Sequence, residues 1–287
     1  MIRLVAYDLD GTVMSDTNQI VGEAVSAIRA LLDRGIAIAS ISGRNVEKSQ
    51  EPFSAEPEIL LNTYLGCYNG AVVLGPAKEG GRSLLHEQRM AASALEGAVA
   101  FVDSRGLNFV FCSCRVGDGA VQEEYIADRD SESVRKLAAL AGLEMVVDGA
   151  IVKRIREREF ERPPKLLILP GPDTREQVLS EMQAQMGDTV YLARTGDDRI
   201  EVMHPEVNKA VALRAICREA GVEPEASMAI GDGDNDLPML GAAGTGVLMA
   251  NADEGTRKAA ARMGVEVTAS LEADGFSDAL HRHALDI

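Results

Sequence analysis

Short apolar segments alternate with amphipathic helical segments along the first part of the chain. Residues 2–7 are rich in β-forming side chains, apolar residues recur at helical spacing over 21–32, and residues 36–41 form a second apolar run. A strand–helix–strand order of this kind favours parallel strands, because a helix carries the chain back to the same end of the sheet. The pattern therefore predicts an α/β fold with a doubly wound parallel sheet whose two faces are covered by helices.

The alternation is interrupted in the middle of the sequence and then resumes. We expect the remaining core strands at residues 59–61, 72–74, 200–203, 227–230 and 245–248, with helices over 209–220 and 253–263. The middle segment has its own expected helices at 91–104, 131–141 and 174–186, strands at 107–111 and 165–169, and a charged loop or edge segment over 152–164. The stretches at 76–82 and 195–198 are interpreted as linkers. The expected domains are a catalytic core of residues 1–82 and 196–287, with an inserted α/β cap of residues 83–195.

The charge of the chain restricts its partners. A chain of 287 residues is long enough for one large or two modest domains, and its formal net charge is −16. Nucleic acids and anionic membrane surfaces would be repelled at long range, so we expect neither as a partner. A small anionic metabolite remains possible if the site itself supplies positive charge.

The cellular compartment is expected to be the cytoplasm. The apolar run at the start of the chain reaches Asp8 at once, so we expect neither a signal peptide nor a membrane-spanning helix there. Cys67, Cys112, Cys114 and Cys217 match no zinc or redox spacing, and we expect four reduced thiols.

The first expected strand leads directly into Asp8-Leu9-Asp10-Gly11-Thr12. Ligands of open α/β sheets bind where strands end, and two carboxylates placed there can divide the work of attack and proton transfer. Gly11 permits the sharp turn that points backbone N–H groups at an anion. An ordinary Asp-Gly turn is the alternative when this motif is taken alone.

A dense acidic motif, Gly-Asp-Gly-Asp-Asn-Asp, follows a later expected strand and contains Asp232, Asp234 and Asp236. Carboxylates this close together repel one another unless a cation offsets their charge, and magnesium prefers such oxygen ligands. A calcium-binding EF-hand loop is excluded, because its sixth position needs Gly and is Leu237, and its twelfth needs Glu and is Ala243. An acidic surface turn remains the alternative.

Two weaker signals complete the set. Ser42-Gly43-Arg44 follows the second expected strand and offers a hydroxyl and a glycine N–H to a phosphate, although Ser-Gly is also common in loops. Lys209 begins an expected helix and could neutralise a phosphate oxygen, although an isolated lysine is usually a solvated surface residue.

The four motifs in this order resemble the haloacid dehalogenase superfamily of phosphotransferases. More narrowly, the chain is similar to the Cof-type (type IIB) sugar-phosphatase branch, whose Rossmann-like core carries a large α/β cap. Nearly the whole chain takes part in this resemblance. The additional matches are Tyr68-Asn69-Gly70-Ala71, Asn208-Lys209, Met249-Ala250-Asn251-Ala252 and Asp274-Gly275. Ser42 is a small departure, since the branch more often has Thr there.

The resemblance implies a mechanism. Asp8 is the nucleophile and forms an aspartyl-phosphate, and Asp10 first protonates the leaving oxygen and then activates water. Magnesium is held by the side chains of Asp8 and Asp232 and by the carbonyl of Asp10, while Asp236 orders the shell around the metal ligands.

The resemblance also implies the phosphate-binding groups, which are Ser42, Gly43, Lys209, Asn235 and the amide of Leu9. Phosphoryl transfer needs positioning and positive charge against the spreading negative charge, which agrees with a metal and a placed lysine in so acidic a protein.

The expected function is hydrolysis of a small phosphate ester, such as a sugar phosphate. Two alternatives stay open: a phosphomutase of the phosphomannomutase type, which would need a bisphosphate activator, and a non-catalytic sensor of a phosphorylated metabolite. A kinase of the P-loop type is disfavoured, because the sequence has no Gly-x-x-x-x-Gly-Lys-Ser/Thr loop. The identity of the substrate does not follow from the fold.

Overall fold

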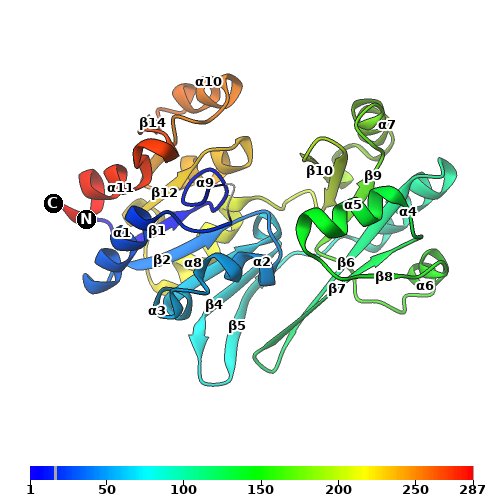
Figure 1. Cartoon of the computed structure of the whole chain (residues 1–287), viewed down its shortest axis with the longest axis horizontal. Helices are drawn as coiled ribbons and strands as arrows, with labels where there is room; N and C mark the ends of the chain where they lie inside the picture. Colours follow the sequence, from blue (N-terminus) through cyan, green and yellow to red (C-terminus); the bar gives the residue numbers. More distant parts are fainter. Residues whose placement is uncertain (16–17, 287) are drawn as a thin grey trace. The chain divides into compact units, whose positions relative to one another are not determined.

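The computed structural model describes residues 1–15 and 18–286 and contains two compact units, each built on its own β-sheet (Figure 1). The first unit, called the core here, consists of Met1–Glu87, Asp118–Ala120 and the chain from Asn208 onward. The second unit, called the cap, consists of Gln88–Gly117 and Val121–Val207. The observed boundaries thus lie at 87/88 and 207/208 and differ from those expected at 83 and 195.

The core sheet has eight strands in the order β14-β13-β12-β1-β2-β3-β4-β5. Its strands are β1 (Leu4–Tyr7), β2 (Ala37–Ile41), β3 (Thr63–Cys67), β4 (Val72–Lys78), β5 (Gly81–Glu87), β12 (Ser227–Gly231), β13 (Thr245–Leu248) and β14 (Glu266–Val267). All neighbours from β14 to β3 are parallel, whereas β4 and β5 pair in antiparallel fashion at one edge. The main parallel sheet agrees with the predicted fold class.

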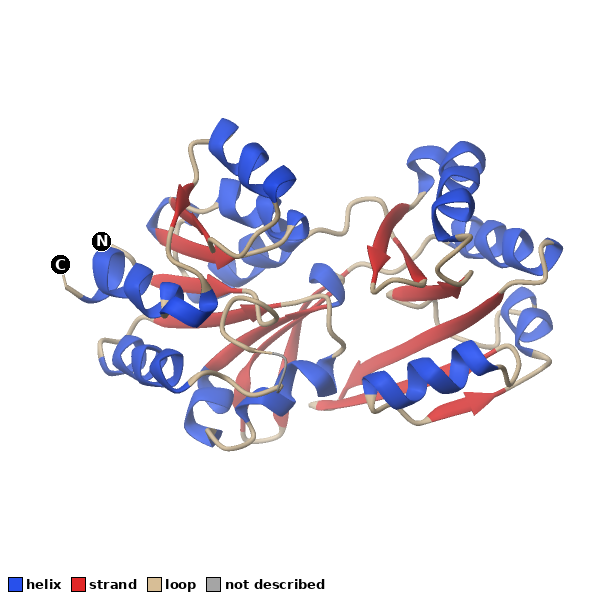
Figure 2. Cartoon of the chain, turned by 45° about the horizontal axis from the view of Figure 1, so that its top comes forward, coloured by secondary structure: helices blue, strands red, loops and turns tan. Residues whose placement is uncertain are grey.

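Helices cover both faces of the core sheet (Figure 2). They are α1 (Gly22–Asp33), α2 (Val46–Gln50), α3 (Pro57–Asn62), α8 (Lys209–Ala220), α9 (Leu237–Ala242), α10 (Glu254–Arg262) and α11 (Gly275–Leu280). The central strand β1 is fully buried and alternates between two apolar clusters. Val5 and Tyr7 join the cluster that contains α1 and α11, while Leu4 and Ala6 join the cluster of α8 and α9. This period of two is what burial on both faces requires.

Two expectations for the core were wrong. Residues 59–61 lie in helix α3, not in a strand, and Pro57 occupies the start of that helix. Ile59 is fully buried while Leu61 is 53% exposed, which fits helical spacing because a strand would place both on one face. The expected linker at 76–82 is the β4–β5 hairpin, in which Gly80 and Gly81 have positive φ and close the turn.

The cap has a six-stranded sheet in the order β10-β11-β9-β6-β7-β8. Its strands are β6 (Asn108–Gly117), β7 (Ala120–Ala127), β8 (Met145–Val147), β9 (Lys165–Leu169), β10 (Tyr191–Thr195) and β11 (Arg199–Met203). Its helices are α4 (Ala92–Ser104), α5 (Glu132–Ala141), α6 (Ile151–Arg156) and α7 (Arg175–Met186). The side chains of α4, α6 and α7 pack in one apolar cluster with β6, β9 and β11.

The strand expected at 200–203 belongs to the cap and not to the core. It is β11, which pairs with β9 and β10, and the expected linker at 195–198 is the tight turn between β10 and β11. Part of the expected charged loop at 152–164 is helix α6, whose Ile151 and Ile155 are buried among the cap residues. Strands β7 and β8 were missed, because the polar residues that alternate along β7 hide its apolar face.

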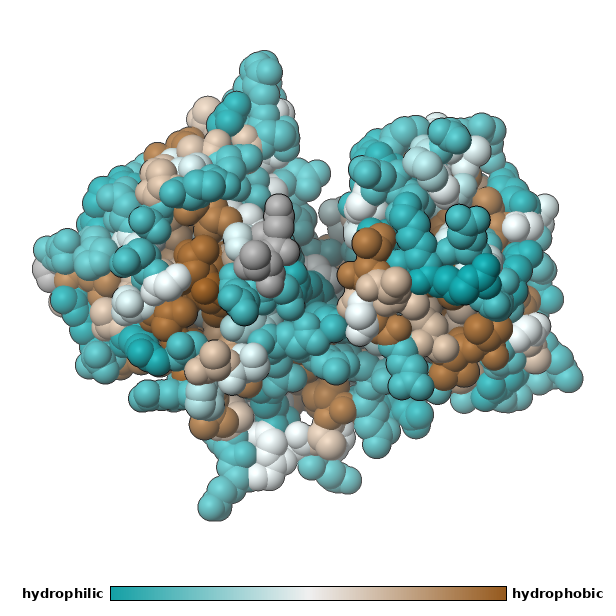
Figure 3. Space-filling model, viewed as in Figure 1, coloured by the Kyte–Doolittle hydropathy of each residue, from teal (hydrophilic) through white to brown (hydrophobic). Residues whose placement is uncertain are grey.

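Few large apolar side chains of the described residues are exposed to solvent. The face seen in Figure 3 is mostly hydrophilic, with smaller apolar areas on each unit. Among the described residues, no helix combines the length and the apolar character that crossing a membrane requires.

Candidate active site

The loop that follows β1 forms the first side of the site. The Leu9 carbonyl accepts hydrogen bonds from the N–H groups of Thr12, Val13 and Met14 at 3.0–3.3 Å, which turns the chain sharply after Asp8. Gly11 has φ +72°, and a Cβ atom on it would lie 2.2 Å from Oδ2 of Asp232. Glycine is therefore needed here both for the backbone conformation and for the close approach of the second acidic loop.

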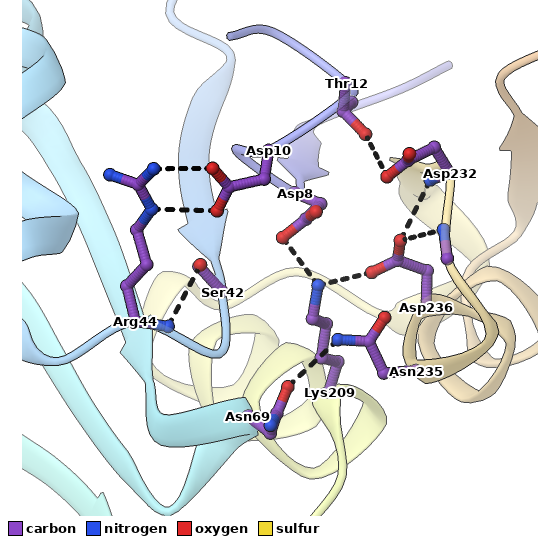
Figure 4. A network of polar contacts seen from close by, with 11 residues as sticks. Asp8, Asp10, Thr12, Ser42, Arg44, Asn69, Lys209, Asp232, Asn235 and Asp236 are labelled. Carbon is purple, nitrogen blue, oxygen red and sulfur yellow. Dashed lines mark hydrogen bonds and ion pairs between the residues drawn. The ribbon is translucent and has the colours of Figure 1, made fainter. Parts of the chain in front are cut away.

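A buried lysine connects the proposed nucleophile to the second acidic loop. Nζ of Lys209 donates to Oδ1 of Asp8 at 2.6 Å and also to Oδ1 of Asp236. Lys209 is fully buried and Asp8 is 7% exposed. Asn208 caps α8 by accepting from the N–H of Val211, so Lys209 begins the helix with its side chain directed into the site (Figure 4).

The loop after β12 supplies two more carboxylates. Oδ2 of Asp236 accepts from the N–H groups of Asp232 and Gly233 at 2.9 and 2.8 Å, which closes the turn back on itself. Oδ1 of Asp232 lies 3.4 Å from the Thr12 hydroxyl, which donates to it. Because both oxygens of Asp236 accept hydrogen bonds, Asp236 holds the loop and Lys209 in place.

The donor set fits a divalent cation. Asp8, Asp232 and Asp236 each offer one carboxylate oxygen, and these three oxygens lie within 4.8 Å of one another. With Lys209 as their only described ion-pair partner, the three carboxylates carry two more negative charges than positive charges. A hard cation with oxygen ligands relieves this repulsion, and magnesium is held in this way in many phosphate-handling sites.

Burial and the repulsion between these carboxylates also shift the pKa values of the site. Burial raises the pKa of Asp8, opposed by the charge of Lys209 and increased by Asp236 and Asp232. Burial, together with the nearby charge of Asp236, raises the pKa of Asp232 to about 6. Burial alone would lower the pKa of Lys209, but the charges of Asp236 and Asp8 outweigh it and raise the pKa. The lysine is therefore charged, and the carboxylates gain from any additional cation.

The carboxylate of Asp10 lies apart from that of Asp8. Its Oδ2 accepts from Nε of Arg44 at 2.8 Å and its Oδ1 accepts from a second Arg44 nitrogen, so the pair is bidentate. Figure 4 shows Asp10 turned toward Arg44, whereas Asp8 points to Lys209. The Asp10 side chain is 58% exposed, which leaves it accessible to solvent.

The expected phosphate-binding residues come from three different strand ends. Ser42 is 1% exposed after β2, and its Oγ accepts from the N–H of Arg44 at 3.2 Å. Nδ2 of Asn235 donates to Oδ1 of Asn69 at 3.1 Å, and a Cβ atom on Gly43 would lie 3.3 Å from that same oxygen. Gly43 and Asn235 are thus brought together through Asn69.

Sequence reasoning gave no role to Arg44, Asn69 or Asn251, although it named the motifs that contain them. Asn69 is 5% exposed and adopts φ +57° at the end of β3, and the N–H of Asn69 donates to the Ser42 carbonyl at 2.9 Å. The available signal was position, since each of these polar residues follows a buried strand. Their partners lie far away in sequence and could not be derived from it.

Comparison with known proteins identifies the family. A family model described as haloacid dehalogenase-like hydrolase matches residues 5–280. The chain belongs to this family. It is 26% identical over 254 residues to an HMP-PP phosphatase of Cronobacter sakazakii, covering 88% of this chain and 85% of that protein. Two predictions are thereby confirmed: the chain is a member of the haloacid dehalogenase superfamily, and it is a phosphoric monoester hydrolase.

Solved structures of the family share the fold. A haloacid dehalogenase-like hydrolase from Bacteroides thetaiotaomicron is 23% identical, with a TM-score of 0.78 over 98% of this chain and 99% of that chain. A structure described as a subclass IIB sugar phosphatase is 20% identical, with a TM-score of 0.76 over 99% of both chains. This similarity supports the predicted fold, a haloacid dehalogenase core with the type IIB architecture.

Proposed function

We propose that this hydrolase is a magnesium-dependent phosphatase that cleaves a small phosphate ester through an aspartyl-phosphate on Asp8. The observation that carries the proposal is the buried ion pair between Asp8 and Lys209, which lies beside two further carboxylates. A charged lysine at 2.6 Å orients the attacking carboxylate and favours its ionised form against the effect of burial. A binding protein without catalysis has no need for this arrangement next to a second, accessible carboxylate.

In the first step, a carboxylate oxygen of Asp8 attacks phosphorus and the bond to the ester oxygen breaks. Asp10 gives its proton to the departing oxygen, which leaves as an alcohol, and Asp8 carries the phosphoryl group. In the second step, Asp10 takes a proton from water, the water attacks phosphorus, and inorganic phosphate leaves Asp8 free. Because Arg44 occupies both oxygens of Asp10, the carboxylate must exchange this partner before it transfers a proton.

The remaining groups hold the phosphate. Lys209, Ser42 and Asn235, together with the amides of Leu9 and Gly43, would donate to its oxygens as negative charge spreads over them. The side chains of Asp8 and Asp232 and the carbonyl of Asp10 would hold magnesium, which supplies positive charge next to the transferred group.

We propose a sugar phosphate as the substrate class and the cap as the unit that selects it. The proposal draws on the subclass IIB sugar phosphatase among the structural relatives, and the HMP-PP phosphatase relative adds HMP-PP to the compounds to be tested. We also propose a cytoplasmic location, because four buried cysteine thiols suit a reducing compartment. The net charge of −16 argues against nucleic acid as a partner.

The test is phosphate release from a panel of phosphorylated sugars, HMP-PP and nucleotides, with magnesium, with calcium and with EDTA. We expect release with magnesium, none in EDTA and little with calcium, whose looser and higher coordination misplaces the carboxylates. Full activity in EDTA contradicts the metal assignment. A product that is an isomeric sugar phosphate, formed only with a bisphosphate activator, favours a phosphomutase. Tight binding without turnover of any compound favours a sensor.

A further inference from the structure

Asn251 lies in the loop after β13 and connects the two acidic loops of the site. Its Nδ2 donates to the carbonyl of Gly11 at 2.9 Å and to Oδ2 of Asp232 at 3.2 Å. Its Oδ1 accepts from the N–H of Leu271 at 3.0 Å. One amide group thus joins the loop after β1, the loop after β12 and the start of a later helical turn.

The backbone around Asn251 is also held. The Arg257 guanidinium donates to the carbonyls of Ala250 and Ala252, the two neighbours of Asn251, at 3.0 and 2.8 Å. The N–H of Ala250 donates to Ala269 at 3.2 Å. The amide of Asn251 is therefore presented from a fixed loop, and its position does not depend on the acidic residues that it contacts.

Only an amide side chain can make these three bonds at this length. The Gly11 carbonyl and the Asp232 carboxylate both need a donor, whereas the Leu271 N–H needs an acceptor. An aspartate in place of Asn251 would set a carboxylate oxygen against both acceptors, and an alanine would leave all three groups without this partner.

We propose that Asn251 is a positioning residue that sets the magnesium affinity of the site by fixing Asp232 relative to the nucleophile loop. The proposal rests on the proposed magnesium-dependent function. Oδ2 of Asp232 is oriented by Asn251, and its Oδ1 is oriented by Thr12. The Gly11 bond ties this ligand to the turn that carries Asp8 and Asp10, so the ligands on the two loops keep a fixed separation. Removing a group that orients a metal ligand typically weakens metal binding by about 10–100-fold.

The test measures magnesium binding directly, by calorimetric titration of the metal-free full-length protein. We expect Asn251→Ala to weaken magnesium binding by about tenfold or more. Turnover should return toward that of the wild type when magnesium is raised to saturation, because the ligands themselves remain. Asn251→Leu, which keeps the volume but has no donor, should give the same shift. Asn62→Ala is the matched control, since Asn62 is an exposed asparagine that donates to the Glu58 carbonyl of α3 and lies outside the site.

Unfolding of the same variants in EDTA separates positioning from a structural role. Positioning predicts that both Asn251 variants unfold close to the control while binding magnesium more weakly. Unchanged magnesium affinity overturns the proposal, as does a failure of both variants to fold, because either result leaves Asn251 only a structural role. A wild type that binds no magnesium overturns both the metal assignment and this proposal. A wild type that binds magnesium but hydrolyses nothing in the panel overturns the proposed function alone.

Discussion

Replacement of Lys209 by methionine removes the charge from the centre of the site and keeps most of the side-chain volume. Lys209 is fully buried and pairs with Asp8 and Asp236. The mutation leaves two buried carboxylates without a counter-ion, and breaking a buried pair in this way costs about 3–5 kcal/mol. Lys209 lies in the first turn of a helix, but its complete burial predicts that its replacement destabilises the protein.

The assay is urea unfolding of the metal-free protein in EDTA, with Lys258→Met as the matched control. Lys258 lies on α10, is 65% exposed and pairs with Glu254, so its loss should cost less than about 1 kcal/mol. The deficit of the Lys209 variant should shrink as the pH falls, because the pKa of Asp8 is raised and its protonation removes part of the uncompensated charge. Turnover should fall about a hundredfold or more, since a charge contact of the transition state is lost.

A loss of stability no larger than that of the control refutes the buried ion-pair network as described. A loss that is equally large at every pH refutes the electrostatic explanation and leaves only a packing effect.

Three further predictions follow from other parts of the site. With nitrophenyl phosphate, Asp10→Asn should give a burst of nitrophenolate near one equivalent, followed by slow turnover. Nitrophenolate leaves without an acid, whereas the attacking water still needs a base. Asp8→Asn should show neither phase in stopped-flow absorbance. The pKa of Asp232 is raised to about 6 in the folded protein, so the metal-free protein should lose stability as the pH rises from about 4 through 6. Over the same pH range, the stabilisation that magnesium gives in thermal unfolding should increase. A stabilisation by magnesium that is independent of pH contradicts this prediction. Gly11→Ala should weaken magnesium binding and should destabilise the protein more than Gly35→Ala does. Gly35 is the control, because it has a similar φ of +69° but no atom within 4 Å of an added Cβ. Equal losses of stability in the two variants contradict the close approach of Gly11 to Asp232.

The sequence predicted the parts of the site that depend on local chemistry. Asp8, Asp10 and Asp232 follow buried strands of a parallel sheet, and the end of such a strand is a general position for ligand-binding groups. Their place in the site could therefore be predicted without knowing the tertiary contacts. Lys209 needed the combination of motifs, because an isolated lysine carries no sign of burial.

Other features depended on contacts that no local pattern contains. The bidentate bond between Arg44 and Asp10 joins residues 34 positions apart, and the bond between Asn251 and Gly11 joins residues 240 positions apart. Their side chains are ordinary polar residues after strands, and only the fold brings the partners together.

The errors in the fold have local causes. The apolar run at 59–61 is too short for its period to be measured, so the sequence does not distinguish the helix that begins at Pro57 from a strand. Glycine pairs and Gly-Asp pairs mark linkers and tight hairpin turns alike, and both expected linkers proved to be hairpins. The observed boundaries between core and cap therefore differ from the expected ones, because a hairpin keeps the chain within the same sheet.

The central claim is that Asp8 carries the phosphoryl group during turnover. Rapid acid quench of the wild-type enzyme during hydrolysis, followed by mass spectrometry of the peptide that contains Asp8, tests it most directly. We expect a phosphorylated peptide with the added group on Asp8, sensitive to alkali as an acyl phosphate is, and absent when EDTA is present from the start. Turnover in which this peptide stays unmodified while phosphate is released, or in which the label lies on another residue, contradicts this mechanism.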